Sequence, residues 1–236
     1  MKLNKEYNNI KVIGFDADDT LWVNETYYRE AEDEFTKLLS AYETPNKTNQ
    51  ELFKKEMEDL HLYGYGVKSF VLSMIETAIE VSNNSISSKA IQDIINIGKK
   101  MINKPVEMLE GAEEVLKSLF PKYRLIMATK GDLLDQERKL KKSGLAKYFH
   151  HIEVLSDKKE ENYSQLLNHL DIDPSEFLMI GNSLKSDVLP LINIKARAIH
   201  VPYHTTWEHE QVNDEETNGK IYKTIANLTE VLNLLQ

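Results

Sequence analysis

Polar residues that could act on a phosphate ester follow four short apolar runs of this chain. The segment DADDT, residues 16–20, follows the run IKVIGF directly, and Thr129 closes the run RLIMAT. Lys158 comes shortly after HIEVLS, and GNSLKSD, residues 181–187, overlaps the end of EFLMIGN. Because ligands bind at the carboxyl ends of parallel strands, four polar sites in this order predict one shared site.

Two carboxylates at Asp16 and Asp18 suit phosphoryl transfer. Asp16 could attack phosphorus and form an aspartyl phosphate, which splits a difficult displacement into two steps. In extended backbone, Asp18 shares a side with Asp16, so it could protonate the leaving oxygen and then deprotonate the attacking water. General acid–base help of this kind contributes roughly 10²–10⁴-fold.

Cations are needed because a phosphoryl group and the Asp16 carboxylate repel each other. A Mg²⁺ ion held by Asp16, Asp187 and nearby oxygens would neutralise and orient the group. Lys158 would add a second positive charge, and Thr129 Oγ with backbone N–H groups would bind phosphoryl oxygens. The chain has no cysteine, so thiolate metal sites are excluded and oxygen ligands favour Mg²⁺, Ca²⁺ or Mn²⁺.

Strands and helices that would position these residues alternate from about residue 110 onward. Apolar runs predict strands at residues 10–15, 124–129, 151–156, 176–182 and 197–203, and the segment 224–235 is expected to finish in a helix. Such alternation predicts an α/β fold with a Rossmann-like, doubly wound parallel sheet.

Residues 24–103 show a different pattern, in which apolar residues recur at helical spacing. Breaks fall near Pro45, at residues 64–66 and at residues 83–88. An insertion of this size is too long for a loop. We therefore expect a catalytic core of residues 1–22 and 104–236 and an inserted all-helical domain of residues 23–103.

Composition narrows the possible partners. The formal net charge of −9 argues against general nucleic-acid binding, which needs a basic surface. Residues 1–9 contain no apolar run typical of a secretory signal, and no stretch reaches the apolar length needed to span a membrane. We expect a cytoplasmic protein with a small phosphorylated metabolite as its partner, and the oligomeric state is not encoded in any recognisable pattern.

These motifs resemble those of the haloacid dehalogenase superfamily, in its phosphatase branch. GFDADDTLW resembles the first motif, which implies Asp16 as nucleophile, Asp18 as acid/base and the Asp18 carbonyl as a Mg²⁺ ligand. LIMATKGD resembles the second motif through Thr129, and Lys158 matches the third-motif lysine. GNSLKSD resembles the metal-binding fourth motif, and residues 23–103 stand where the family places its helical cap.

The sequence departs from the family pattern at three positions. Asn182 stands where the family usually has an aspartate, so it offers an uncharged amide oxygen to the metal. Lys158 is followed by Lys159 instead of proline, which makes Lys159 an alternative for the same role. Lys130 follows Thr129 and would bring another cation to the phosphate.

Asp18 favours phosphoryl transfer over dehalogenation, because a departing halide needs no proton. The sequence therefore predicts a Mg²⁺-dependent phosphatase for small phosphate esters. A phosphomutase using the same aspartate pair, or a non-catalytic phospho-acceptor or metabolite sensor, stays as an alternative. The segment HVPYHTTWEHE, residues 200–210, is expected to serve packing or the surface, since its histidines lack simple metal-ligand spacing.

Overall fold

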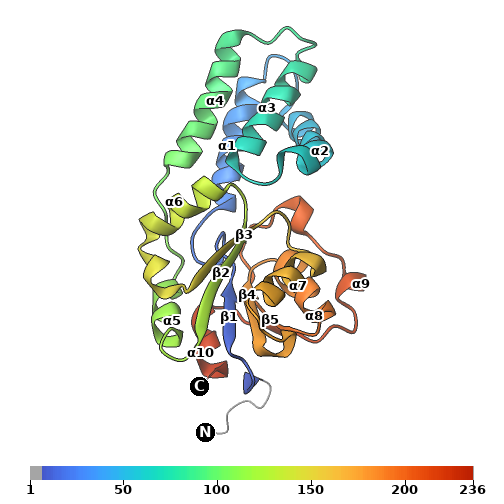
Figure 1. Cartoon of the computed structure of the whole chain (residues 1–236). Helices are drawn as coiled ribbons and strands as arrows, with labels where there is room; N and C mark the ends of the chain where they lie inside the picture. Colours follow the sequence, from blue (N-terminus) through green and yellow to red (C-terminus); the bar gives the residue numbers. More distant parts are fainter. Residues whose placement is uncertain (1–6, 236) are drawn as a thin grey trace. The chain divides into compact units, whose positions relative to one another are not determined.

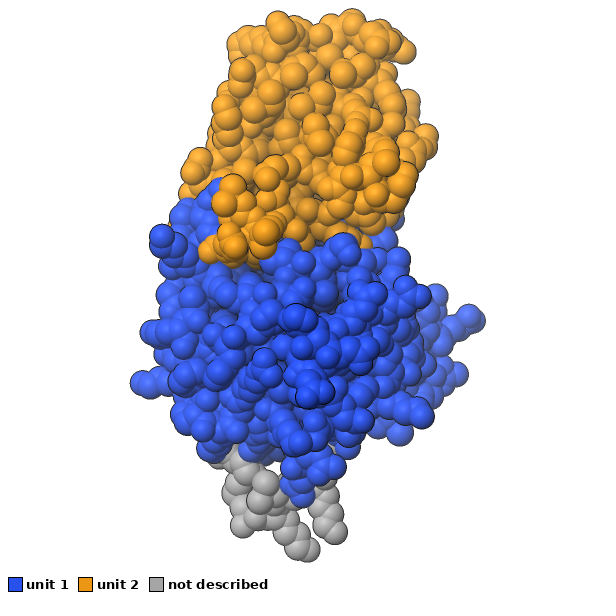
Figure 2. Space-filling view, viewed as in Figure 1, with its two compact units in different colours: residues 1–25, 106–130, 138–236 blue, residues 26–105, 131–137 orange. Residues whose placement is uncertain are grey.

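Two compact units make up the chain, and the computed structural model describes residues 7–235 of it. Unit 1 comprises residues 1–25, 106–130 and 138–236, and unit 2 comprises residues 26–105 and 131–137 (Figure 2). Unit 1 contains a sheet, whereas unit 2 is helical (Figure 1).

The sheet of unit 1 has six parallel strands in the order β3-β2-β1-β4-β5-β6. Figure 1 labels β1 to β5. The strands are β1 (Val12–Phe15), β2 (Arg124–Lys130), β3 (His151–Leu155), β4 (Phe177–Gly181), β5 (Arg197–His200) and β6 (Lys223–Thr224). The strand order reverses beside β1, with β2 on one side and β4 on the other. This arrangement confirms the predicted doubly wound α/β fold.

Helices cover both faces of this sheet, because the strands are apolar on both faces. Ile13 and Phe15 pack with α5 and α10, whereas Val12 packs with α7 and α8 on the opposite face. The helices outside residues 25–103 are α5 (Ala112–Leu119), α6 (Leu133–Ser143), α7 (Glu160–His169), α8 (Leu189–Asn193), α9 (Asp214–Thr217) and α10 (Val231–Leu234). Shorter 3₁₀ turns are η2 (Leu145–Tyr148), η3 (Pro174–Glu176), η5 (Glu208–Glu210) and η6 (Leu228–Glu230), and a π-helical turn, η4, spans Leu184–Val188.

Unit 2 has its own hydrophobic core. Its chain forms four helices, α1 (Glu25–Leu38), α2 (Pro45–Tyr63), α3 (Val67–Val81) and α4 (Ser88–Asn103). The core is built from one stripe of each helix and includes the fully buried Phe35, Leu52, Met74 and Ile94. This agrees with the helical spacing of apolar residues in the sequence.

The C-terminal segment finishes in a helix, as the sequence predicts, with α10 covering Val231–Leu234. The start of the segment is extended, because Thr224 pairs with His200 in β6. Glu230 accepts the backbone N–H groups of Ala226 and Asn227, so helical structure begins only at residue 228.

None of the helices in residues 7–235 combines the length and the apolar composition that crossing a bilayer requires.

Helix packing in unit 2 depends on Gly98. A Cβ at Gly98 on α4 would lie 2.2 Å from Val71 Cγ2 on α3, and a β-branched side chain has little freedom to move away. Glycine-to-alanine changes inside helices usually stabilise them by roughly 0.5–1 kcal/mol. We expect Gly98→Ala to do the opposite and to cost about 1–3 kcal/mol in urea unfolding, because the site is overpacked.

The compensating variant tests the cause. Combining Gly98→Ala with Val71→Ala removes the clash. In the Gly98→Ala background, Val71→Ala should therefore cost far less stability than it costs in the wild type. A Gly98→Ala protein as stable as the wild type would contradict this packing.

Candidate functional site

The predicted polar residues meet at the carboxyl edge of the sheet, in unit 1. Asp16 follows β1, Thr129 lies near the end of β2, Lys158 follows β3 and Asn182 follows β4. Since all strands are parallel and β1 lies between β2 and β4, these positions share one edge. The reversal of strand order beside β1 makes this the place where such sheets bind ligands.

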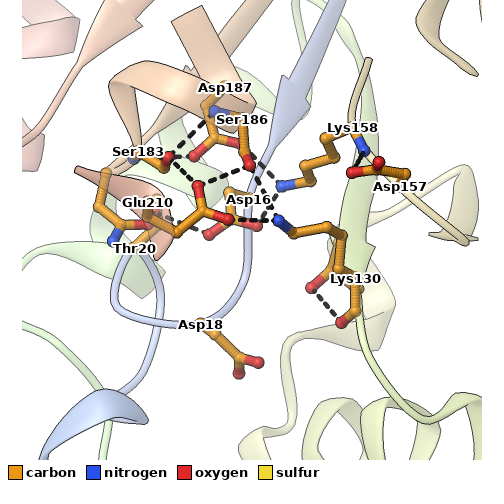
Figure 3. A network of polar contacts seen from close by, with 12 residues as sticks. Asp16, Asp18, Thr20, Lys130, Asp157, Lys158, Ser183, Ser186, Asp187 and Glu210 are labelled. Carbon is orange, nitrogen blue, oxygen red and sulfur yellow. Dashed lines mark hydrogen bonds and ion pairs between the residues drawn. The ribbon is translucent and has the colours of Figure 1, made fainter. Parts of the chain in front are cut away.

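Lys158 joins the two carboxylates at the centre of the site. Its Nζ contacts Asp16 Oδ1 and lies 2.7 Å from Asp187 Oδ1, and its side chain is only 2% exposed (Figure 3). Burial opposes the charge, yet the two carboxylates raise the pKa of Lys158 well above its ordinary value. The site therefore holds a fixed positive charge between two acids.

The structure distinguishes Lys158 from its neighbour. Lys159 Nζ lies 2.8 Å from Asp157 Oδ2, and the Lys159 side chain is 73% exposed. Lys158 is the lysine brought to Asp16, whereas Lys159 pairs at the surface.

Asp16 is almost fully buried at the centre of this network. Burial raises the pKa of Asp16 to about 7, because lost hydration and the nearby Asp187 carboxylate outweigh the stabilising charge of Lys158. Its second oxygen, Oδ2, accepts a hydrogen bond from Thr20 Oγ1 at 3.2 Å. One cation shared by two acids thus leaves the site in need of further positive charge.

Oxygen atoms converge around the side chain of Asn182, at the place expected for a metal. Hydrogen bonding orients the amide so that its nitrogen lies 3.1 Å from the Asp18 backbone oxygen and 3.2 Å from Asp16 Oδ2. The amide nitrogen thus occupies the position where a cation would meet the same oxygens. Turning the amide by half a rotation would present its oxygen instead, so these residues fit Mg²⁺.

The oxygen atoms around Asn182 come from different kinds of group and not from a cluster of acidic side chains. Within residues 7–235, no three His, Asp or Glu side chains gather as a metal site. Asp16 Oδ2 and the Asp18 carbonyl lie beside the Asn182 amide, whereas Asp187 is joined to Asp16 through Lys158. His200 Nε2 lies 3.0 Å from the Asn182 backbone oxygen, and burial lowers the pKa of His200.

Asp187 is positioned by the loop that precedes it. Its Oδ2 accepts the Ser183 N–H at 3.0 Å, and its own N–H donates to the Ser183 carbonyl at 2.8 Å. The segment Leu184–Val188 forms a π-helical turn, a rare local structure that is frequent at functional sites. Gly181 leaves room for this carboxylate, because a Cβ there would lie 2.3 Å from Asp187 Cγ.

Asp18 points away from Asp16, in contrast to the expectation from extended backbone (Figure 3). Its Oδ1 accepts hydrogen bonds from Trp22 Nε1 and Lys139 Nζ, both at 2.7 Å. The chain turns after Asp18, with Asp19 at a φ of 60°, so the alternation of an extended strand ends there. Asp18 therefore has to change rotamer before it can reach a group bound at Asp16.

Thr129 and Lys130 already have partners inside the protein. Thr129 Oγ1 donates to the Lys130 carbonyl at 3.2 Å, and Thr129 is buried. Lys130 Nζ donates to Ser186 Oγ at 2.9 Å and pairs with Glu210. The cation expected at the phosphate from Lys130 is thus neutralised by a carboxylate.

Glu210 and Lys139 are the site residues that sequence reasoning missed. Glu210 belongs to the segment assigned to packing or the surface, yet its carboxylate binds Lys130 and the hydroxyls of Ser183 and Ser186 (Figure 3). Burial alone would raise its pKa, but the Lys130 ammonium and these hydroxyls lower the pKa of Glu210 to about 2. The only signal for Glu210 in the sequence is that it follows β5, and many surface acids stand at similar positions.

Comparisons with known proteins agree on one family. Residues 10–194 match the family described as haloacid dehalogenase-like hydrolase. A hydrolase of that family from Xanthomonas campestris has a TM-score of 0.85 and 36% identity, covering 100% of this chain and 95% of that one. N-acylneuraminate-9-phosphatase of Rattus norvegicus is 24% identical over 202 residues, covering 81% of this chain and 82% of the relative.

The same fold also occurs in dehalogenases. A 2-haloacid dehalogenase from Pseudomonas syringae has a TM-score of 0.62 and 18% identity, covering 96% of this chain and 98% of that one. Since identity at this level shows the fold alone, the choice of reaction depends on the residues of the site.

Gly181 offers a test of how Asp187 is placed. Gly181→Ala should cost about 1–3 kcal/mol in urea unfolding, because the new methyl group occupies the space of the Asp187 carboxylate. It should also abolish the stabilisation of the protein by added Mg²⁺, measured as a shift of Tm.

Gly14→Ala is the matched control for this experiment. Its Cβ would lie 2.5 Å from Phe177 Cζ, so it should lose stability similarly while keeping the response to Mg²⁺. An unchanged response to Mg²⁺ in Gly181→Ala would contradict the assigned position of Asp187.

Proposed function

The chain belongs to the haloacid dehalogenase-like hydrolase family, and we propose that it is a Mg²⁺-dependent phosphatase acting on small phosphorylated molecules through an aspartyl phosphate on Asp16. The observation that carries this proposal is the buried ion pair network in which Lys158 joins Asp16 to Asp187. Acidic side chains are rarely buried unless they are paired with a cation or take part in function. This acid also lies at the ligand-binding edge of its sheet.

Asp16 is the nucleophile in this proposal. A carboxylate oxygen forms a bond to phosphorus while the bond from phosphorus to the leaving oxygen breaks. Lys158 stays bound beside Asp16 and Asp187, where its charge attracts the phosphoryl oxygens. The Thr129 hydroxyl exchanges the Lys130 carbonyl for a phosphoryl oxygen.

Asp18 supplies the proton for the leaving oxygen. It first releases Trp22 Nε1 and Lys139 Nζ and turns towards Asp16. In the second step it takes a proton from water, which attacks phosphorus and regenerates the Asp16 carboxylate. A departing halide needs no such proton, so this acid supports phosphate ester hydrolysis over dehalogenation.

The metal fits the oxygens that surround the Asn182 amide. Asp16, Asp187, the Asp18 carbonyl and the turned Asn182 amide would hold Mg²⁺. When bound, Mg²⁺ would offset the negative charge of the phosphoryl group and align it with Asp16. Asn182 contributes no charge, so we expect weaker metal binding than with an aspartate at this position.

Small free molecules are the proposed substrates. In this proposal, the helical residues 26–105 serve as the cap that excludes water and selects the ester. The similarity to a rat phosphatase named for N-acylneuraminate 9-phosphate adds phosphorylated sugar acids to the candidates.

Substitution of the two aspartates separates their roles. With p-nitrophenyl phosphate and Mg²⁺, Asp16→Asn should release no phosphate above background, because the amide cannot act as nucleophile. Asp18→Asn should lower kcat by roughly 10²–10⁴-fold, the usual contribution of general acid–base catalysis.

The surface change Asp173→Asn serves as control and should leave the rate unchanged. Full activity in Asp16→Asn would contradict the proposal, and isomerised substrate without free phosphate would identify a mutase.

The two adjacent lysines provide an internal control. Lys158→Met removes the cation between Asp16 and Asp187, so kcat/KM should fall by roughly 10²–10³-fold, as when a transition-state donor is lost. Lys159→Met removes only an exposed ion pair and should keep the rate within about twofold. Equal losses in both variants, measured by phosphate release, would show that Lys158 has no special role.

A further inference from the structure

A segment far along the chain contacts the loop that carries Asp187. Glu210, at the end of η5, accepts the hydroxyl protons of Ser183 and Ser186, the latter at 2.6 Å. One residue earlier, the His209 carbonyl accepts a hydrogen bond from Lys185 Nζ at 2.6 Å. His209 and Glu210 therefore bind three residues of the loop, Ser183, Lys185 and Ser186.

Ser183 connects Glu210 directly to Asp187. The Ser183 hydroxyl donates to Glu210, while the Ser183 N–H donates to Asp187 Oδ2 at 3.0 Å. The same hydroxyl oxygen accepts the Ser186 N–H at 3.0 Å, which closes the turn. A displacement of Ser183 would therefore move the hydrogen-bond donor on which the Asp187 carboxylate depends.

Lys130 keeps the Glu210 carboxylate in this position. It pairs with Glu210 and also donates to Ser186 Oγ at 2.9 Å (Figure 3). The side chains of Lys130 and Glu210 are only 14% and 12% exposed, so solvent screens this pair weakly. The pair joins the end of β2 to η5, and the hydrogen bond from Lys130 to Ser186 joins β2 to the loop after β4.

We propose that Glu210 is a positioning residue, which fixes the loop of residues 183–187 through the two serine hydroxyls and thereby places Asp187. This role deepens the proposed phosphatase function and rests on it. Glu210 touches neither Asp16 nor Lys158 in the contacts of the described residues, so it acts through Ser183 and Ser186. Supporting residues that orient metal ligands typically change metal affinity or activity by about 10–100-fold.

Amide hydrogen exchange of the protein without metal or substrate provides the first measurement. In Glu210→Ala, the Ser183, Ser186 and Asp187 amides should exchange at least about tenfold faster, because the loop opens more easily. Amides of β4, Leu178 to Ile180, should keep their rates, since they pair with β1.

Kinetics of phosphate release provide the second measurement. Glu210→Ala should lower kcat by about 10–100-fold and change KM by less than about threefold, because Asp187 is displaced while substrate contacts remain. Glu210→Gln keeps an acceptor for the serines and should recover most of both losses. Glu208→Gln, an exposed acid in the same short helix, should behave like the wild type.

A double variant separates positioning from simple charge balance. In Lys130→Met/Glu210→Ala neither charge remains, but the serines still lack their acceptor, so fast loop exchange and low kcat should persist. Recovery of both in the double variant would overturn the proposal, because Glu210 would then serve only to neutralise Lys130. Unchanged loop exchange in Glu210→Ala, or acceleration throughout β4 as well, would also overturn it.

The two proposals can fail separately. A wild-type protein that releases no phosphate contradicts the phosphatase function, whereas exchange in the loop depends on neither metal nor substrate and still decides whether Glu210 holds it.

Discussion

The buried ammonium group of Lys158, placed between the carboxylates of Asp16 and Asp187, is the interaction on which the site depends. These three charges lie at the carboxyl edge of a sheet whose neighbouring strands β1 and β4 are apolar. Removing the Lys158 ammonium would leave two buried carboxylates without this cation, which is costly in a medium of low polarity. The arrangement still contains one more acid than base, and a divalent cation would offset this excess before an anionic substrate binds.

Around this centre, neighbouring groups hold the reactive residues in a resting arrangement. The Asn182 amide nitrogen meets oxygens suited to a cation, Thr129 donates to a backbone carbonyl, and Trp22 with Lys139 holds Asp18. Each of these contacts can be exchanged by rotating one side chain. The backbone that carries the residues need not move, because the parallel strands fix where Asp16, Thr129 and Lys158 begin.

Much of this could be predicted from sequence because it depends on local patterns. Apolar runs ending in polar residues located β1 to β5 but not the two-residue β6, and helical spacing located α1 to α4. Contacts between distant segments could not be predicted. Glu210 reaches Lys130 across 80 residues, and Lys139 reaches Asp18 across 121 residues, so no local pattern encodes either pair. The orientation of Asp18 was also missed, since it depends on a turn at Asp19 that spacing alone does not reveal.

The central claim is that Asp16 carries the phosphoryl group during the reaction, and peptide mass mapping tests it most directly. The Asp18→Asn protein, which should hydrolyse the intermediate slowly, is mixed with acetyl phosphate and Mg²⁺, quenched in acid and digested. The account predicts the added mass of one phosphoryl group on Asp16. A phosphoryl group found on another residue, or steady phosphate release without any modified peptide, would contradict it.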